Sequence, residues 1–525
     1  MSESALQAAA GRESEVVATG TRRMSVLSSW WPLVAVTVLA AVLRLVTLGS
    51  QSLWYDEAFT PVHVLRAGLG ATLHNVVHTE NTPPLWYVLE WVISRVLGSG
   101  AVALRLLSAL AGIATVPVAW ALGCELAGRR AAIVAAALVA SSPLLVWYSQ
   151  EARAYGLFVL TASLAMLCFV RALHEPTVRR LGAFALSASL ALLTHYFAVF
   201  LLIGMMSWLA WSALSGASRE GRTTGARAAG HGAVLRVLCA AALPVLVGAA
   251  LIPLILAQGG HGTQWIGEWA LSRRLEAIPQ YYLTGYTGAA LGHGVELLVL
   301  VAILAGFGYG LWRTLTPREE RGALIALTIA AAGVLVPIAL ALLGADYLAP
   351  RNLVAAMVPV SVLLAIVMTA QRSGRVGIGF AGLLVLAFLA LTIDVSLSPR
   401  LQRGDWAGVA KLLRLAPPDR VITTVELGAA PLKYYLPSLR NLARGSRVRV
   451  TEIDETGYAP LRKSAGSLPA PGFHLSERRD IHGLIVYRFT SNAPVTVSEL
   501  ALRRHVITLA HPEVLVPVSP TDKQL

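Results

Sequence analysis

Long apolar runs separated by short polar segments make up most of the first 400 residues of the chain. A run of about 17–25 mainly apolar residues is long enough to cross a bilayer as a helix. Apolar runs near that length lie at 30–48, 103–122, 132–148, 156–173, 197–213, 235–257, 289–312, 322–343, 352–370 and 377–397, and a shorter one lies at 181–194. The pattern therefore predicts a polytopic α-helical membrane protein with about eleven transmembrane helices.

The apolar segment 85–97 differs from these runs. It has 13 residues, follows Pro83 and Pro84, and carries Glu90 and Arg95. Apolar helices of about 10–14 residues usually lie in the membrane interface rather than cross it. We therefore predict that 85–97 is an interfacial helix in the first outer loop, 49–102, instead of an additional span.

The arginines of the loops support that interpretation. If 85–97 lies flat, most of the basic loops fall on one side of the bilayer, which is typical of the cytoplasmic side. These loops carry Arg22/Arg23, Arg129/Arg130, Arg179/Arg180, Arg219/Arg222/Arg227, Arg313/Arg318/Arg321 and Arg372/Arg375. The distribution predicts that residues 1–29 are a cytosolic tail and that loop 49–102 faces outward. It also explains the net charge of +14 without a nucleic-acid partner.

Composition supports the same class of protein. The chain is 56% hydrophobic and only 14% charged, whereas soluble domains average about 25% charged residues. Two of its three cysteines lie inside apolar runs, so neither a disulfide nor a cysteine metal site is expected. The sequence also lacks a Walker A loop, an HExxH helix and a GxSxG elbow, which argues against ATP hydrolysis, zinc proteolysis and serine hydrolysis.

The composition changes from about Ser398. Residues 404–415 form an amphipathic pattern, and 420–425 and 483–489 resemble strands with a helical stretch between them. We therefore predict a transmembrane domain over 30–397 and a small extracytoplasmic α/β domain over 398–525, a normal domain size.

The first outer loop carries two polar clusters. Asp56 and Glu57 follow the first span, and His78 and Glu80 stand later in the same loop. Carboxylates beside a bilayer cost free energy, so their clustering suggests acid–base chemistry. A structural alternative exists for both clusters, because Asp56 suits a helix N-cap and the second cluster precedes the helix that begins after Pro83 and Pro84.

Other candidates for substrate binding lie where the predicted spans end on the outer side. They are Arg105, Glu151, Arg153, His195, Tyr196, Tyr347 and Arg351. A guanidinium group presents a fork of donors that matches phosphate oxygens. The alternatives are that Arg105 only reaches toward the interface, that Glu151 and Arg153 pair with each other, and that His195 is structural.

In order along the chain, four segments together resemble the GT-C glycosyltransferases, in the branch of the protein O-mannosyltransferases and aminoarabinose transferases. The segments are WYDE at 54–57, HTENTPP at 78–84, LRLLSAL at 104–110 and SQEARAYGL at 149–157. The resemblance covers roughly residues 30–370, and 398–525 lie beyond it. It implies a polyprenyl-phosphate-linked sugar donor and transfer that inverts the anomeric centre.

The resemblance also implies roles for individual residues. Asp56 stands at the position of the catalytic base, and Glu80 falls near a second acidic position. Arg105 matches the arginine of an R-L-x-S-A stretch. Relatives often carry an aspartate in the third loop, where this chain has Glu151 and Arg153, so an acidic role there is in doubt.

The chemistry of such a donor leads to similar expectations. Its reacting carbon must sit at headgroup depth, with a base on one side and cationic groups for the departing phosphate on the other. Asp56 suits the first role, and the second has several candidates: Arg105, Arg153, His195 and Arg351. No cofactor is required on this hypothesis, although a divalent cation at Asp56 and Glu80 is an alternative. The acceptor is a hydroxyl group of a protein, glycan or lipid.

Two other classes of function compete with this hypothesis. A transporter or lipid flippase calls for polar groups near the bilayer midplane, whereas these are concentrated at one predicted face. A non-catalytic envelope scaffold that binds a partner through 398–525 would make Asp56, Glu80 and Arg105 individually dispensable.

Overall fold

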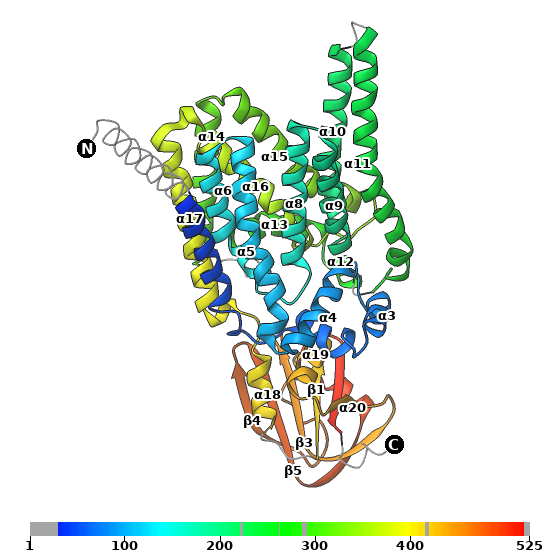
Figure 1. The fold of residues 1–525 in the computed structure, drawn as a ribbon. Helices are drawn as coiled ribbons and strands as arrows, with labels where there is room; N and C mark the ends of the chain where they lie inside the picture. The colour runs from blue at the N-terminus through cyan, green and yellow to red at the C-terminus, as the bar shows by residue number, and fades with distance from the viewer. Residues whose placement is uncertain (1–29, 221–223, 262, 286–290, 415–418, 519–525) are drawn as a thin grey trace, which may run out of the picture.

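The computed structural model describes residues 30–518, apart from 221–223, 262, 286–290 and 415–418, and it does not describe the side chains of 213–236 and 264. The predicted cytosolic tail, 1–29, lies outside the described residues. A bundle of long helices occupies one part of the molecule, and a domain built on a β-sheet lies against one end of the bundle (Figure 1). The protein is therefore a helical membrane protein with a small mixed-sheet domain at its C-terminal end.

Each apolar run coincides with a helix or with a bent pair of helices. The bundle contains a helix at Trp30–Leu45, followed by α5 (Ala101–Leu126), α6 (Arg129–Ser141), α7 (Pro143–Ser149), α8 (Tyr155–His174), α9 (Val178–Thr194), α10 (Ala198–Glu220), α11 (Thr224–Ala257), α14 (His293–Trp312), α15 (Pro317–Leu342), α16 (Met357–Met368) and α17 (Gly374–Leu397). Within the described residues, seven helices are long and apolar enough to span, or eight with the bent pair. The count of eleven spans stays a prediction.

The bent pair is α6 and α7, whose axes differ by 56°. Ser142 breaks the helix and accepts a hydrogen bond from the backbone N–H of Leu145, and Pro143 occupies the first position of α7. Proline suits that position because its missing N–H would be unsatisfied there anyway. The bend turns the chain into the polar segment that follows Ser149.

Short helices connect the long ones. They are α2 (Tyr55–Phe59), the π-helical turn η1 (Thr60–Val64), α3 (Leu69–Thr79), α4 (Leu85–Leu97), α12 (Gln264–Glu268), α13 (Leu271–Thr284), and the 3-10 helices η2 (Pro350–Ala356), η3 (Gln371–Ser373) and η4 (Pro399–Leu401). Helix α4 lies near the sheet domain (Figure 1). Arg153, which precedes α8, contacts Glu80, which precedes α4. Both loops therefore lie at the same end of the bundle, as expected if 85–97 does not cross.

The C-terminal domain contains a six-stranded sheet in the order β2-β6-β1-β3-β5-β4, in which only β1 and β3 run parallel. Its elements are α18 (Trp406–Arg414), β1 (Arg420–Val425), α19 (Glu426–Tyr435), β2 (Leu439–Asn441), β3 (Arg447–Tyr458), β4 (His474–Ile481), β5 (Leu484–Ser498), α20 (Glu499–Arg504) and β6 (Pro512–Pro517). The amphipathic helix and both strands expected from the sequence are present. The central strand β3 was not expected, because its buried positions include Glu452, Asp454 and Glu455 and therefore break the apolar pattern of a strand.

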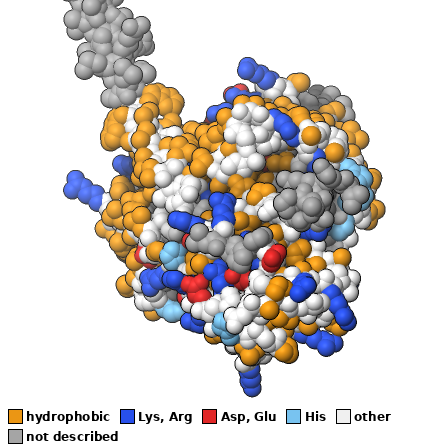
Figure 2. Space-filling view, turned by 90° about the horizontal axis from the view of Figure 1, so that it is seen from below, with side chains coloured by type: hydrophobic (Ala, Val, Ile, Leu, Met, Phe, Trp, Pro, Cys, Tyr) orange, Lys and Arg blue, Asp and Glu red, His pale blue; other side chains and the backbone are white. Residues whose placement is uncertain are grey.

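The C-terminal domain is held against the first loop of the bundle. The hydroxyl of Tyr435 accepts a hydrogen bond from the backbone N–H of Leu53 at 2.8 Å, and Ser52 Oγ donates to Asp405 Oδ1 at 3.0 Å. A small apolar cluster joins the two parts through Leu53, Ala58, Leu104, Ala152 and Ala430. Charged side chains of both signs gather on this end of the molecule (Figure 2). The sheet domain thus packs directly on the loop that carries Asp56.

Candidate active site

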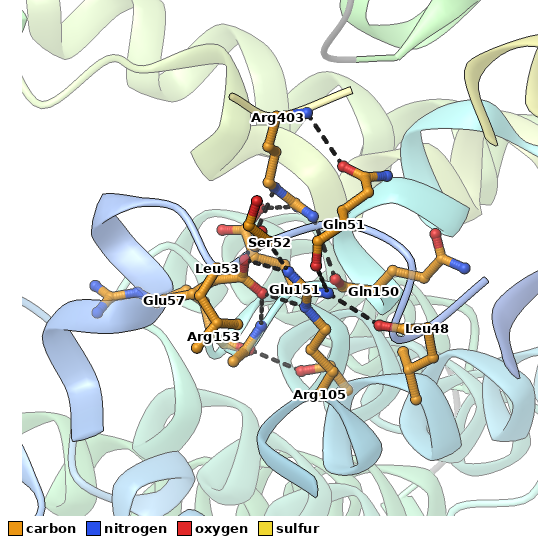
Figure 3. Close-up of polar contacts among 12 residues, drawn as sticks. Leu48, Gln51, Ser52, Leu53, Glu57, Arg105, Gln150, Glu151, Arg153 and Arg403 are labelled. Carbon is orange, nitrogen blue, oxygen red and sulfur yellow. Dashed lines mark hydrogen bonds and ion pairs between the residues drawn. The ribbon is translucent and has the colours of Figure 1, made fainter. Parts of the chain in front are cut away.

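Four arginine–carboxylate pairs lie close together where the first loop, the 149–155 segment, η2 and the segment after α17 meet. The pairs, with their N–O distances, are Asp56–Arg351 (2.6 Å), Glu57–Arg105 (2.7 Å), Glu80–Arg153 (3.1 Å) and Glu151–Arg403 (2.8 Å). Figure 3 shows the buried part of this network. Because every pair joins segments distant in sequence, the site forms only in the folded chain. Its eight charges balance when all the groups are ionised.

Asp56 and Arg351 form the pair with the most exposure. Their side chains are 17% and 19% exposed, and the guanidinium of Arg351 lies over the ring of Trp265 at 4.9 Å. Arg153 Nη1 also approaches the backbone carbonyl of Asp56 at 3.5 Å. Asp56 does not cap α2, because the N-cap is Trp54 and has no side-chain hydrogen bond. Of the four pairs, this one therefore leaves the most side-chain surface accessible.

Glu80 holds Arg153 next to that pair. Its Oε2 atom receives the Arg153 guanidinium at 3.1 Å and the Tyr87 hydroxyl at 2.5 Å. Its other carboxylate oxygen has no hydrogen-bond partner among the described residues. Glu80 does not cap the following helix, whose N-cap is Pro84 and carries no side-chain hydrogen bond. Glu80 therefore makes both contacts through one oxygen, while its second oxygen is buried.

Glu57 and Arg105 form a buried pair whose hydrogen-bonding capacity is used inside the protein. Arg105 Nε and Nη2 donate to the two Glu57 oxygens, each at 2.7 Å. The remaining guanidinium N–H groups donate to the carbonyls of Leu48, Gln51 and Ser52 at 2.9–3.1 Å. Burial opposes ionisation of Glu57, but Arg105 and Arg403 outweigh it and hold the pKa of Glu57 below its usual value.

In this geometry Glu57 and Arg105, both predicted to bind substrate, make internal contacts, and substrate binding by them stays a prediction. All five N–H donors of Arg105 are occupied, and its side chain is 1% exposed. The pair instead fixes the turn that leads into α2 and thereby places Asp56. The alternative of an arginine reaching toward the interface is also wrong, because Arg105 points into the protein.

We expect Arg105→Met to destabilise the protein by about 3–5 kcal/mol, because it leaves the buried Glu57 carboxylate without its cation. Thermal unfolding of the purified protein in detergent measures the effect. The matched control is Arg171→Met, whose pair with Glu125 is exposed and should contribute less than about 1 kcal/mol. Equal losses in the two variants would contradict the anchoring role.

The fourth pair brings in Arg403, which was not among the candidates from the sequence. Arg403 lies beyond the last apolar run, outside the region of the GT-C resemblance. Its Nη2 atom donates to Glu151 Oε2 at 2.8 Å, and its guanidinium lies over the Trp147 ring at 4.2 Å. The expected alternative of a Glu151–Arg153 pair is wrong, because each of the two residues has a different partner. Glu151 is fully buried, and burial raises its pKa to about 7 against the opposing effect of Arg403.

His195 lies near the site but is structural in its contacts. Its ring stacks on Phe158 at 4.6 Å between centroids, and its Nδ1 atom accepts the backbone N–H of Phe197 at 3.2 Å. Burial, and then the positive charges of Arg153 and Arg351, lower the pKa of His195 to about 3. These effects disfavour the charged imidazole, which makes His195 the least suited of the four candidates for a cationic phosphate partner.

Three further candidates make other contacts. The Tyr196 hydroxyl donates to Gln258 Oε1 at 2.7 Å, and Gln258 in turn binds backbone carbonyls on either side of Glu80. The His78 ring hydrogen-bonds the His74 carbonyl on its own helix. Tyr347 is 54% exposed. Tyr196 thus supports the loop of Glu80, whereas neither His78 nor Tyr347 joins the four ion pairs.

The described residues contain no group of three or more His, Cys, Asp and Glu side chains placed to hold a metal ion. The negative charge of the site is balanced instead by guanidinium groups. A divalent cation at Asp56 and Glu80 would need further ligands from a substrate. The fold and the site together define a membrane protein with a charged, partly accessible centre at one end of its helix bundle.

Comparisons with known proteins identify the fold. The model of the family "Dolichyl-phosphate-mannose-protein mannosyltransferase" matches residues 81–220. ArnT from Cupriavidus metallidurans bound to undecaprenyl phosphate superposes with a TM-score of 0.51 and 14% identity, over 87% of this chain and 97% of that chain. Its apo state gives a TM-score of 0.51 and 15% identity, over 88% and 98%. No curated protein sequence matches. The resemblance to GT-C superfamily glycosyltransferases, in the branch named above, is confirmed.

The structural match also reaches further along the chain than expected. Residues 1–397 make up 397 of 525 residues, or about 76%, which is less than the 87% that the ArnT structure covers. The likeness therefore includes part of 398–525. This corrects the expectation that it ends before the C-terminal domain.

Proposed function

We propose that the protein is a glycosyltransferase that moves a sugar from a polyprenyl-phosphate donor to an acceptor hydroxyl at the outer face of the membrane. Transfer inverts the anomeric centre, and Asp56 is the general base. The observation that carries this proposal is the contact between Asp56 and Arg351, a base beside a phosphate-binding cation at the accessible edge of a buried ion-pair cluster. ArnT shares this fold and has been crystallised with undecaprenyl phosphate.

The reaction needs one proton acceptor and one site for negative charge. The acceptor oxygen forms a bond to the anomeric carbon as the bond from that carbon to the phosphate oxygen breaks. The hydroxyl proton passes to Asp56, and the electron pair of the broken bond leaves with the polyprenyl phosphate. Preorganised positive charge at the departing group is typically the largest catalytic contribution.

Arg351 and Arg153 are the arginines suited to the departing phosphate. Their side chains are 19% and 13% exposed, whereas Arg105 and Arg403 are 1% and 4% exposed. In this structure Arg351 holds the Asp56 carboxylate at 2.6 Å. Donor binding therefore has a second effect: when the phosphate takes over Arg351, Asp56 is released to act as the base.

Glu80 complements this arrangement from the other side. It orients Arg153 through one oxygen, and its other oxygen, which is buried and unpartnered among the described residues, is the acceptor that we assign to a hydroxyl of the bound sugar. Hydrogen bonds to a charged group are stronger than those between neutral groups. We assign Glu80 to sugar binding and to positioning Arg153, rather than to proton transfer.

The outer-face location rests on charge. The site lies at the end of the bundle that carries α2, α4 and the sheet domain. Arginine-rich loops such as 129–130, 179–180 and 372–375 are expected at the opposite end from the topology above, and arginine-rich loops favour the cytoplasm. A polyprenyl-phosphate headgroup at the outer surface would then lie level with Asp56.

The test is to incubate the purified protein with a panel of polyprenyl-phosphate-linked hexoses and pentoses and to follow donor consumption. We expect enzyme-dependent release of polyprenyl phosphate from at least one donor, stimulated by a hydroxyl acceptor. The Asp56→Asn protein is the control for contaminating activity. Consumption that is equal with Asp56 and with Asn at this position would contradict the assignment of the base.

A further inference from the structure

Arg403 follows the last helix of the bundle in the sequence, but its side chain lies in the active site. We propose that Arg403 is a positioning residue of the active site, which holds Glu151 in place and joins the C-terminal domain to the transfer reaction. The link to transfer rests on the proposed function, whereas the link between Arg403 and Glu151 does not.

Several groups of the site contact the side chain of Arg403. Besides the Glu151 carboxylate, its guanidinium reaches the Gln150 carbonyl at 3.4 Å and lies 4.0 Å from Glu57 Oε2. The Trp147 ring covers one face of the group. Arg403 thus contacts Trp147 in α7 and both Gln150 and Glu151 in the segment between α7 and α8, which is more than a single surface ion pair provides. Figure 3 shows Arg403 beside Gln150 and Glu151.

The backbone around Arg403 is fixed as well. Its N–H donates to Gln51 Oε1 at 3.2 Å, and the Ser52 hydroxyl, whose one proton is shared with Asp405, lies 3.3 Å from the carbonyl of Gly404. Asp405 accepts from Ser52 and also from the backbone N–H of Gly408 in the first turn of α18. The segment therefore connects the first loop to the first helix of the C-terminal domain with little freedom between them.

The reason for placing an arginine here is the charge of Glu151. One oxygen of this buried carboxylate has no hydrogen-bond partner among the described residues. The ionisable groups that face it are Asp56 and Glu57 from the first loop, Arg105 from α5, Tyr148 from α7, Tyr155 from α8, Arg351 from η2 and Arg403. Of these, Arg403 is the cation in direct contact with Glu151, whereas Arg105 and Arg351 are paired with other carboxylates.

This arrangement gives the pair a dependence on pH. Burial raises the pKa of Glu151 to about 7, while Arg403 lowers it. A carboxyl whose pKa is higher in the folded than in the unfolded protein stabilises the fold at pH values below the unfolded-state pKa. That contribution is lost as the pH rises through the folded-state pKa. Without Arg403 the folded-state pKa of Glu151 rises further, so the loss of stability at neutral and alkaline pH becomes larger. In acid, Glu151 is protonated and needs no cation.

The experiment compares melting temperatures of the full-length protein in detergent at about pH 5.5 and about pH 8. We expect Arg403→Gln to lower the melting temperature by at least about 3 °C more at the higher pH than at the lower one. The double variant Arg403→Gln/Glu151→Gln should lose most of this pH dependence, because the carboxylate that Arg403 contacts directly is then absent. The control, Arg400→Gln, changes an arginine that is 71% exposed and 3.9 Å from Asp394, and should show no such difference.

A decrease that is equal at both pH values, or one that persists in the double variant, would overturn the proposal. Should Arg403→Gln not be recovered folded, Arg403→Lys provides the same test, because it keeps the charge and loses the fork and the stacking on Trp147. The lysine variant should then melt earlier than the unaltered protein with a smaller dependence on pH. A lysine variant indistinguishable from the unaltered protein at both pH values would overturn the specific role of the guanidinium.

Transfer provides the second measurement. We expect Arg403→Gln to lower kcat on the order of 100-fold at neutral pH, because small misplacements of reacting groups have effects of that size. KM for the donor should change far less, because Arg403 does not contact it. A fall in kcat with little change in donor KM, together with recovery of kcat in the double variant, would support the positioning role. A rise in donor KM alone would contradict it. If the unaltered protein transfers no sugar, the proposed function fails, while the melting result still decides the Arg403–Glu151 link.

Discussion

The Asp56→Asn variant should lose sugar transfer by about 10²–10⁴-fold, the usual contribution of a positioned general base. Asparagine has nearly the same shape and can still accept a hydrogen bond from Arg351, but it cannot take the acceptor proton. Initial rates with a polyprenyl-phosphate sugar at saturating acceptor measure the loss. Donor binding should persist or improve, because Arg351 would no longer be held by a carboxylate.

The control for this variant is Glu125→Gln. Glu125 pairs with Arg171 near the other end of α5, roughly 30 Å along the helix axis from Arg105 at about 1.5 Å per residue. Transfer by Glu125→Gln should match the unaltered protein. An Asp56→Asn protein that elutes normally and retains most of its activity would refute Asp56 as the base and leave the fold assignment unaffected.

The second large effect is expected for Arg351→Gln, which removes the cation proposed to receive the departing phosphate. Transfer should fall roughly 10²–10³-fold, as when one preorganised group is removed from a site of developing charge. Arg351→Lys should recover only part of the rate, because an ammonium group lacks the planar fork and stacks less well on Trp265. Rates at several donor concentrations separate the effect on binding from the effect on the chemical step.

The comparison variant is Arg313→Gln, which changes an exposed arginine after α14 and should leave transfer unchanged. If Arg351→Gln raises only the acceptor KM, the phosphate-binding role is wrong. If Arg351→Gln is inactive but binds donor as tightly as the unaltered protein, Arg351 acts on the transition state alone. Release of Asp56 by the donor would then need another explanation.

The Asp56→Asn and Arg351→Gln variants test one consequence of the charge balance in the site. Each of the four carboxylates in the site already has a guanidinium partner. An incoming phosphate adds negative charge, and it can be accommodated most easily at the pairs that are partly exposed. We expect the buried pairs Glu57–Arg105 and Glu151–Arg403 to keep their geometry when the donor binds, and the pairs of Asp56 and Glu80 to exchange partners.

Much of the fold follows from local patterns in the sequence. Each apolar run became a helix because a buried or lipid-facing segment satisfies its backbone hydrogen bonds internally only in that form. The short helix at 85–97 followed from the length of its apolar run, and β1 from an apolar run between turn residues. The strand β3 escaped prediction, because its buried acidic residues are neutralised by partners such as Arg488, which is distant in sequence.

The site was only partly predictable for the same reason. The sequence placed Asp56, Glu80, Arg153 and Arg351 among the candidates, and the structure brings all four together. It also suggested Arg105 and His195 as phosphate partners, although the structure commits both to internal contacts. Nothing local distinguishes an arginine that is saturated by backbone carbonyls from one that is open to a ligand.

The sequence by itself determined the class of protein, the helices of the bundle and the loops that carry the charged candidates, because hydrophobic periodicity and charge are local properties. The pairing of those charges was decided by the tertiary structure. Arg403 lies in the site only because the C-terminal domain packs on the first loop, and the donors of Arg105 are occupied only because Glu57 and three carbonyls surround it. Which charged groups remain free to act depends on contacts between segments far apart in the chain.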